Sequence, residues 1–180
     1  YDYICSRESD PLKTKIYKHN MSLGEFIESG ISMETDNGMT RLISGVGENV
    51  AYGECSIETL HLAKSNIDNH FATVGLTEKF DESVILLRNE CGWDNINYIK
   101  RNVSARKTIP SQKDIKIAEQ FNKYDLELYE YCKKIFDQKI LNGGEEFTQQ
   151  LQEYRRKNQR YAFIYRLFKP FHSIYKSCYR

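Results

Sequence analysis

The sequence predicts an α/β fold, in which helices pack on part of a mostly parallel sheet. The run Phe71 to Leu76 combines apolar residues with Thr and Gly, which is typical of a short buried strand. Asp81 to Cys91 follows almost at once and repeats Val84, Leu87 and Cys91 at helical spacing. A strand that leads directly into a helix is half of a βα unit, and such units build parallel sheets.

The first helix is expected only after residue 22. Residues 1–22 are polar and aromatic without a period, and Pro11 excludes a helix that passes through that point, so this stretch is predicted as a loop. Ser22 is a suitable N-cap for a short helix that Gly30 ends. One face of that helix would hold Leu23, Phe26 and Ile27.

Two more helical segments are predicted before the strand. The polar turn at residues 35–38 precedes Met39 to Ser44, which suits one helical turn closed by Gly45. A longer helix is expected from Ser56, again a suitable cap, to about Asn69. Its inward positions would be Leu60, Ala63 and Ile67.

The carboxyl-terminal part is predicted to be helical. Ser111 and Asp114 resemble a capping box with Asp in place of Glu, and the helix that follows should reach about Phe121. Another helix is expected from Asp125 to the breaker Asn142-Gly143-Gly144, and a long one from Glu145 to Phe168. The long helix carries a narrow apolar stripe of Phe147, Leu151, Tyr154, Tyr161, Ile164, Tyr165 and Phe168.

The Phe147–Phe168 stripe has several potential partners. It could pack on the domain itself or on a helix of a partner chain. Attachment to a membrane surface is less favoured, because Pro170 and the mixed charges interrupt the pattern.

Composition excludes several classes of function. With 180 residues and a formal net charge of +1, the chain is long enough for one core and offers no bulk attraction for nucleic acid. No stretch approaches the roughly 20 apolar residues that a membrane span needs. The five cysteines are scattered, with no C-x-x-C and no neighbouring pair of histidines, so no metal site is predicted.

The segment from Tyr98 to Thr108 carries the most chemically active side chains. It places four cations among Asn, Ser and Thr residues ahead of a helix, a composition that suits a phosphate group. A solvated basic loop has the same composition, so both alternatives remain open on these residues. The sequence has no G-x-x-x-x-G-K-[ST], G-x-G-x-x-G or H-E-x-x-H motif.

Three blocks of the sequence resemble one enzyme family. They are DNGMTRLISG from Asp36, AKSNIDNHFATVGLTEKFDESVILLRNECGW from Ala63, and YDLELYEYCKKIFDQKI from Tyr124. Together they resemble the carboxyl-terminal half of the sulfotransferases that include heparan sulfate 2-O- and 6-O-sulfotransferases and many bacterial relatives. The resemblance covers about residues 11–141, and V-G-L-T-E followed by F-D-E-S is its most specific part.

The resemblance implies a fold and a reaction. Members of this family resemble P-loop nucleotide kinases, so the chain would supply the helix-rich carboxyl-terminal half with part of the parallel sheet. They transfer a sulfuryl group from 3′-phosphoadenosine 5′-phosphosulfate (PAPS) to a hydroxyl of an acceptor, often a carbohydrate, without a metal. The family compartment would be the cytoplasm for a bacterial-type relative, which the sequence favours slightly, or the Golgi lumen for an animal one.

Site residues follow from the same resemblance. The family places a loop before its late helices against the donor nucleotide, which here corresponds to Arg106, Lys107 and Thr108. Supporting contacts would come from Arg101, Asn102 and Ser104. Asn37 and Arg41, in the D-N-G-x-T-R block, could line the acceptor cleft. A purely structural pairing of Arg41 with a neighbouring carboxylate is an equal alternative.

The resemblance is incomplete at its amino-terminal side. The 180 residues contain no phosphosulfate-binding loop of the P-K-T-G-T-S kind and no R-D-P segment, and the family's catalytic base normally precedes the part that is matched. The chain is therefore expected to be a fragment: residues 1–141 the carboxyl-terminal part of a sulfotransferase domain, and residues 142–180 a helical extension. Such a fragment would lack activity by itself. A non-enzymatic helical interaction module or a binder of anionic glycans is the alternative.

Overall fold

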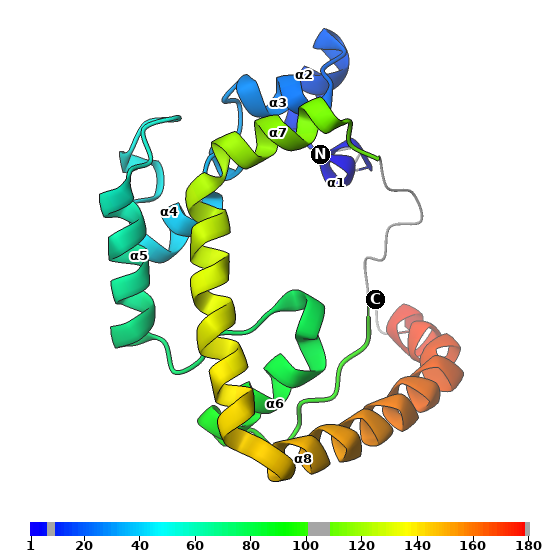
Figure 1. Cartoon of the computed structure of the whole chain (residues 1–180). Helices are drawn as coiled ribbons and strands as arrows, with labels where there is room; N and C mark the ends of the chain where they lie inside the picture. Colours follow the sequence, from blue (N-terminus) through cyan, green and yellow to red (C-terminus); the bar gives the residue numbers. More distant parts are fainter. Residues whose placement is uncertain (7–9, 101–108, 179–180) are drawn as a thin grey trace. The chain divides into compact units, whose positions relative to one another are not determined.

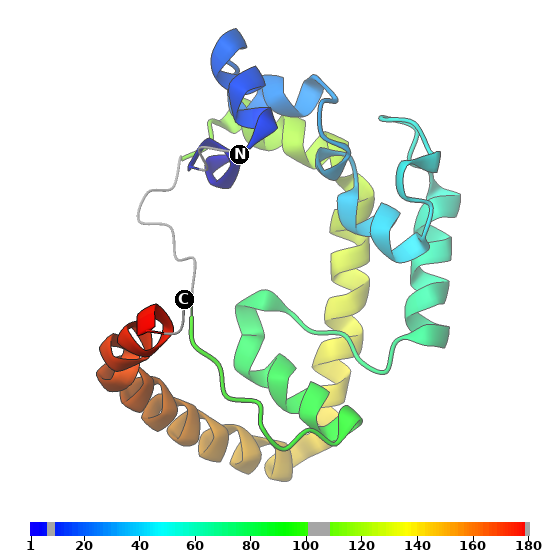
Figure 2. The same ribbon diagram turned by 180° about the vertical axis from the view of Figure 1, so that it is seen from behind.

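The computed structural model describes residues 1–6, 10–100 and 109–178, and across these residues the chain is helical (Figures 1 and 2). The α-helices are α1 (Asp2–Ser6), α2 (Pro11–His19), α3 (Leu23–Glu28), α4 (Gly38–Ser44), α5 (Ile57–His70), α6 (Phe80–Cys91), α7 (Gln112–Phe121) and α8 (Lys123–Cys178). Three short 3-10 turns are η1 (Met33–Thr35), η2 (Gly47–Asn49) and η3 (Thr77–Lys79). No strand or sheet occurs in the described residues.

The prediction of an α/β fold with part of a parallel sheet is therefore wrong. Phe71 and Leu76 do have extended backbone angles. A strand also needs a neighbour with which to exchange ladder hydrogen bonds, and the described part of the chain supplies none. Val74 and Leu76 instead pack into a core made by helices, so the apolar run is buried without a sheet.

The chain divides into two compact units. Unit 1 comprises residues 1–71 and 104–131, and unit 2 comprises residues 72–103 and 132–180. Residues 123–131 of α8 belong to unit 1 and the rest of α8 to unit 2. The predicted division at residue 141 falls within unit 2, and the existence of a separate extension stays a prediction.

The described residues at the amino terminus form α1 and α2, contrary to the predicted loop. Pro11 is the first residue of α2, and the side chain of Asp10 caps this helix by accepting a hydrogen bond from the backbone N–H of Leu12 (3.0 Å). Proline is favoured at a first helical position, since its missing N–H would have no partner there. The prediction treated Pro11 as an obstacle, but in this position it starts a helix.

Local capping signals predicted most of the other helices correctly. Ser22 caps α3 and Ser111 caps α7, each in a reciprocal capping box with the acidic residue three positions later. Gly92 ends α6 with a φ of 66°. The predicted break after residue 141 is confirmed at Gly144, whose φ of 53° and ψ of −138° divide α8. Helices at 38–44 and 57–70 also match their predicted ranges closely.

Unit 1 has its core between α3, α4, α5 and α7. Phe26, Leu60 and Ala63 are fully buried there. Gly24 lets α3 approach α7: its N–H donates to the Asp114 carboxylate (2.8 Å), and an added Cβ would lie 2.8 Å from both Asp114 and Ile117. The absence of a side chain at Gly24 therefore fixes how closely these two helices pack.

Unit 2 has a core formed by the extended segment, α6 and α8. Its buried members are Leu76, Ile85, Leu86, Phe136, Phe147 and Tyr154. Phe136 precedes the break at Gly144, and Phe147 follows it, so the break lets both parts of α8 contribute to the same core. The first part of the predicted Phe147–Phe168 stripe thus packs on its own unit.

Candidate functional site

The V-G-L-T-E-K-F-D-E-S segment folds into a tight turn that positions α6 in unit 2. The Ser83 hydroxyl accepts a hydrogen bond from the N–H of Leu76 (2.8 Å) and lies within bonding distance of the carbonyl groups of Leu76 (3.0 Å) and Lys79 (2.8 Å). A Cβ added at Gly75 would lie 3.0 Å from the Cβ of Ser83. The Ser83 side chain therefore leaves little room for a side chain at position 75, which gives the spacing between Gly75 and Ser83 a structural explanation.

The acidic pair of the F-D-E-S block organises the segment that follows α6. Asp81 accepts hydrogen bonds from the Tyr98 hydroxyl (2.8 Å) and from Nε of Arg155 (3.1 Å). Arg155 also pairs with Glu82 (3.1 Å), and Phe80 packs edge-on against the ring of Tyr98, with 4.6 Å between ring centroids. These contacts join α6, residues 96–100 and α8 around one carboxylate.

Two tyrosines in this cluster keep their protons at neutral pH. Burial raises the pKa of Tyr98 to about 12, and the hydrogen bond to the Asp81 carboxylate acts in the same direction. Burial also raises the pKa of Tyr154, whose hydroxyl donates to the carbonyl of Ile96 (2.9 Å). Both phenols therefore act as hydrogen-bond donors that hold the chain rather than as bases.

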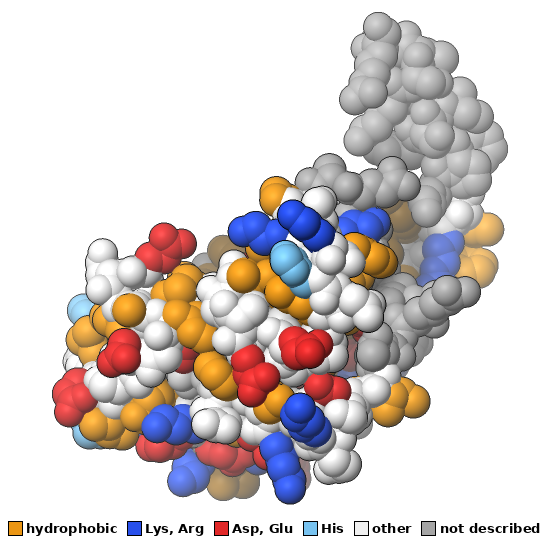
Figure 3. Space-filling model, turned by 90° about the horizontal axis from the view of Figure 1, so that it is seen from above, with side chains coloured by type: hydrophobic (Ala, Val, Ile, Leu, Met, Phe, Trp, Pro, Cys, Tyr) orange, Lys and Arg blue, Asp and Glu red, His pale blue; other side chains and the backbone are white. Residues whose placement is uncertain are grey.

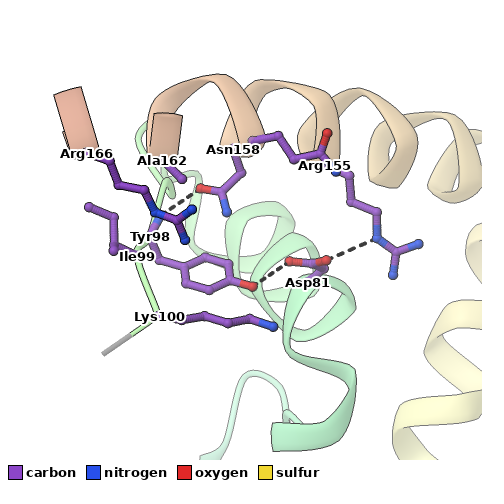
Figure 4. A pocket seen from close by; sticks show the side chains of 9 residues that line it. Asp81, Tyr98, Ile99, Lys100, Arg155, Asn158, Ala162 and Arg166 are labelled. Carbon is purple, nitrogen blue, oxygen red and sulfur yellow. Dashed lines mark hydrogen bonds and ion pairs between the residues drawn. The ribbon is translucent and has the colours of Figure 1, made fainter. Parts of the chain in front are cut away.

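Two pockets of unit 2, of about 350 and 480 Å³, are lined by this cluster, and Figure 4 shows the first of them. Both include Asp81, Tyr98, Lys100 and Arg155. The first adds α8 side chains, and the second adds the turn before α6. The additional residues are Asn158, Gln159, Ala162 and Arg166 in the first, and Thr77, Glu78, Phe80 and Glu82 in the second.

The polar groups of the first pocket suit an anion. Asn158 is oriented by accepting a hydrogen bond from the N–H of Tyr98 (2.9 Å). Hydrogen bonding to Asp81 raises the pKa of Arg155, so this guanidinium stays charged. Lys100 and Arg166 form no ion pair within the part of the chain that is described. Their charges are thus available for a phosphate, sulfate or carboxylate group.

Sequence reasoning identified only part of this pocket. Lys100 belongs to the predicted basic segment, whereas the prediction for residues 145–168 named only the apolar stripe and none of Arg155, Asn158 and Arg166. The signal was present, since positions 158, 162 and 166 follow Tyr154 at helical spacing and continue the side of α8 that faces the core.

The predicted nucleotide contacts lie outside the described residues. They are Arg101, Asn102, Ser104, Arg106, Lys107 and Thr108. Lys100, which directly precedes them, is described and lines both pockets. Donor binding by these six residues therefore stays a prediction.

The other two predicted site residues, Asn37 and Arg41, are buried in unit 1. Arg41 is 3% exposed, forms an ion pair with Asp36, and donates to the carbonyl groups of Val50 (2.5 Å) and Ala51 (2.7 Å). All these partners belong to its own unit. The structure thus shows the structural pairing that the sequence offered as an alternative for Arg41.

Asn37 joins two of the family-like blocks. Its side-chain oxygen accepts hydrogen bonds from the N–H groups of Tyr124 (2.8 Å) and Asp125 (3.2 Å). Asp125 in turn accepts from the N–H (2.7 Å) and hydroxyl (2.7 Å) of Thr40. Asn37 also lines a pocket of about 360 Å³ with Asp36, Gly53, Cys55, Gln120, Phe121 and Lys123.

Metal-binding clusters and membrane spans were also sought in the structure. Among the described residues, no group of His, Cys, Asp and Glu side chains could hold a metal ion. Within the same residues, no helix is both long and apolar enough to cross a membrane. Acidic and basic side chains occur together, among hydrophobic ones, on the face shown in Figure 3.

Comparison with protein families gives a match. A family model described as galactose-3-O-sulfotransferase matches residues 45–166. Those residues contain the F-D-E-S block, the basic segment and the pocket residues of α8. Neither the curated proteins nor the solved structures contain a significant match. The heparan sulfate and bacterial branches expected from the sequence are not confirmed.

Proposed function

Because the chain belongs to the galactose-3-O-sulfotransferase family, we propose that it forms part of an enzyme that sulfates a hydroxyl of a galactose-containing carbohydrate. The donor would be PAPS. The observation that carries the proposal is the family match across residues 45–166, which includes both the F-D-E-S turn and the basic segment. Galactose as the acceptor sugar comes from the family description.

We propose that the donor nucleotide binds at the basic segment. Arg106, Lys107 and Thr108 would contact its phosphate groups, with support from Arg101, Asn102 and Ser104. Lys100 and Arg166 support this assignment, because they line a pocket that begins where the segment begins. Guanidinium and ammonium groups with neighbouring hydroxyls form charge-assisted hydrogen bonds to such oxygens.

The proposed reaction is an in-line displacement at sulfur. The acceptor hydroxyl oxygen forms a bond to sulfur while the bond from sulfur to the bridging phosphate oxygen breaks, and a base takes the hydroxyl proton. Cationic side chains would stabilise the charge that grows on the leaving phosphate. The chain supplies such cations, whereas the base and the phosphosulfate loop expected for the family are not recognised in its sequence. We therefore propose that residues 1–180 alone do not transfer sulfuryl groups.

Asn37 and Arg41 would contribute to acceptor binding by shaping the wall of the unit 1 pocket. Asn37 lines this pocket directly, and Arg41 holds the neighbouring Asp36 in place. Arg41 is thus proposed as a positioning residue. The compartment, cytoplasm or Golgi lumen, stays a prediction.

Calorimetric titration with 3′-phosphoadenosine 5′-phosphate tests the donor site. The full-length natural protein that contains this chain is compared with its Arg106→Ala/Lys107→Ala variant. We expect micromolar binding that the variant weakens at least tenfold, or about 1.4 kcal/mol. A matched control is Lys15→Ala/Lys18→Ala, which removes two exposed cations from α2 and should leave binding unchanged.

Other outcomes separate the alternatives. No binding by the folded full-length protein would contradict the enzyme proposal and favour a helical interaction module. Binding to a sulfated glycan that falls steeply with salt and ignores the nucleotide would indicate an anionic-glycan binder instead.

A further inference from the structure

Between residues 155 and 168, α8 turns its polar side toward the rest of unit 2. Asn158, Ala162 and Arg166 line the pocket of that unit, and Figure 4 shows Asn158 and Arg166 extending toward the segment that holds Tyr98. The opposite side of the helix is apolar and exposed, and we call it the outer face. Its members are Phe163 (65% exposed), Ile164 (53%), Leu167 (55%) and Phe168 (61%).

This orientation is the reverse of the usual one. The outer-face positions are related as i, i+1, i+4 and i+5, so they lie on one side of the helix. A surface helix of a globular domain normally buries its apolar side and exposes its polar side. Earlier in the same helix, Phe147 and Tyr154 follow that rule and are buried in the core. The apolar pattern therefore turns outward after Tyr154.

The charge of this segment is also unusual. No Asp or Glu follows Glu153, although the whole chain is almost neutral. Eight cations follow that position: Arg155, Arg156, Lys157, Arg160, Arg166, Lys169, Lys176 and Arg180. Arg156 and Arg160 are exposed and continue the row of Phe163 and Leu167 at helical spacing. The outer face is thus apolar at its centre and cationic at its edge.

The sequence extends the same pattern toward the carboxyl terminus. Phe171, Ile174 and Tyr175 follow Phe163 at i+8, i+11 and i+12, the spacing that keeps residues on one side of a helix. Helix α8 continues to Cys178 without a non-helical residue at Pro170. Of the two features that argued against membrane attachment in the sequence, Pro170 does not end the helix, and the mixed charges do not extend beyond Glu153.

We propose that the outer face docks on an anionic lipid surface, with the helix lying in the plane of the membrane interface. Phe, Ile and Leu side chains would enter the boundary between headgroups and acyl chains, while the flanking Lys and Arg side chains contact lipid phosphates. Arg155 and Lys157 are held in ion pairs and Arg166 lines the pocket, which leaves Arg156, Arg160 and the three later cations of the sequence for the lipid. Cations without a neighbouring Asp or Glu match a continuous anionic surface better than a protein groove, which would offer acidic groups only at particular positions.

Vesicle flotation tests the proposal. The protein is mixed with vesicles of phosphatidylcholine alone or with about one-third phosphatidylserine, a composition rich in anionic lipid. We expect flotation with the anionic vesicles only. Phe163→Ser/Leu167→Ser and Arg156→Glu/Arg160→Glu should each reduce the bound fraction at least tenfold. Circular dichroism verifies that the variants remain folded.

Two matched controls test whether flotation depends on the outer face in particular. Leu42→Ser/Leu141→Ser alters two apolar side chains that are each 72% exposed elsewhere, and Lys15→Glu/Lys18→Glu reverses two cations on α2. Both should leave flotation unchanged. The proposal is overturned if wild-type protein does not float with anionic vesicles, or if the serine variant floats equally well. Equal retention of wild type and serine variant on heparin, without flotation, would identify a general polyanion site instead.

Discussion

The hydroxyl of Tyr98 donates a hydrogen bond of 2.8 Å to Asp81, and Arg155 holds the other oxygen of the same carboxylate at 3.1 Å. One acidic side chain thereby connects α6 to the segment before the basic residues and to α8. The F-D-E-S block has a definite physical task in this chain, which is to fix the pocket beside the proposed donor site.

Removing the Tyr98 hydroxyl should loosen that connection. We expect Tyr98→Phe to lower the free energy of unfolding by about 1 kcal/mol, because a hydrogen bond to a carboxylate is lost while the aromatic contact with Phe80 remains. Urea denaturation checks this. Tyr17→Phe, at a position of α2 that is 63% exposed, provides a comparison on a different surface. An equal or larger loss in that variant would contradict the special role of Tyr98.

Filling the close approach at Gly75 should be costly. Gly75→Ala places a Cβ 3.0 Å from the Cβ of Ser83, and we expect a destabilisation of about 1–3 kcal/mol from overpacking. The matched control is Gly38→Ala at the start of α4, where the nearest side-chain atom, the Cβ of Glu34, is 3.8 Å away. Chemical denaturation of both variants gives the comparison. Equal stability of the two variants would mean that the turn is not tightly packed.

Breaking the Arg41–Asp36 pair should destabilise unit 1 strongly. Arg41→Ala leaves the carboxylate of Asp36 buried without its cation, and we expect a loss of about 3–5 kcal/mol. Arg41→Lys should recover only part of this, since a single ammonium cannot replace the several directed donors of the guanidinium. Thermal unfolding measures both variants. Wild-type stability in Arg41→Ala would contradict this structural role of the pair.

The contact between α3 and α7 should weaken in acid. Hydrogen bonds from Ser111 and from the N–H of Gly24 hold the pKa of Asp114 below its ordinary value of 3.8. A depressed folded-state pKa contributes stability that is present above that ordinary value and is lost as the pH falls through the folded-state pKa. The difference in melting temperature between wild type and Asp114→Asn should therefore shrink below about pH 4.

The control for this pH dependence is Asp94→Asn, at an exposed position outside either helix. Its melting temperature should follow that of wild type across the same range. If the difference in melting temperature between wild type and Asp114→Asn were constant from pH 7 to pH 3, the Asp114 carboxylate would not cause the loss of stability in acid.

Sequence patterns predicted the features that are local and missed those that are not. Ser22 and Ser111 each cap a helix through residues three positions away, so the pattern contains the whole interaction. The expected strand at Phe71–Leu76 depended on a partner strand elsewhere, and its apolar residues found helices instead. Pro11 breaks a helix in the interior but favours one at the first helical position, and which of the two applies depends on the Asp10 cap before it.

The site shows the same division. Lys100 lies in a segment whose composition indicates anion binding, and it does line the pocket. Arg155 and Arg166 reach that pocket from more than fifty residues away, because α8 packs along α6 through Phe147 and Tyr154. A sequence pattern cannot supply that packing before the fold is known.

Sulfuryl transfer itself is the most direct measurement of the central claim. The full-length natural protein is incubated with PAPS and a galactoside acceptor, and the product is analysed by mass spectrometry, beside the Arg106→Ala/Lys107→Ala and Lys15→Ala/Lys18→Ala variants. The account predicts one sulfate added per galactoside, lost with the first variant and kept with the second. A folded protein that binds the nucleotide product but sulfates no galactoside or other carbohydrate hydroxyl would contradict it.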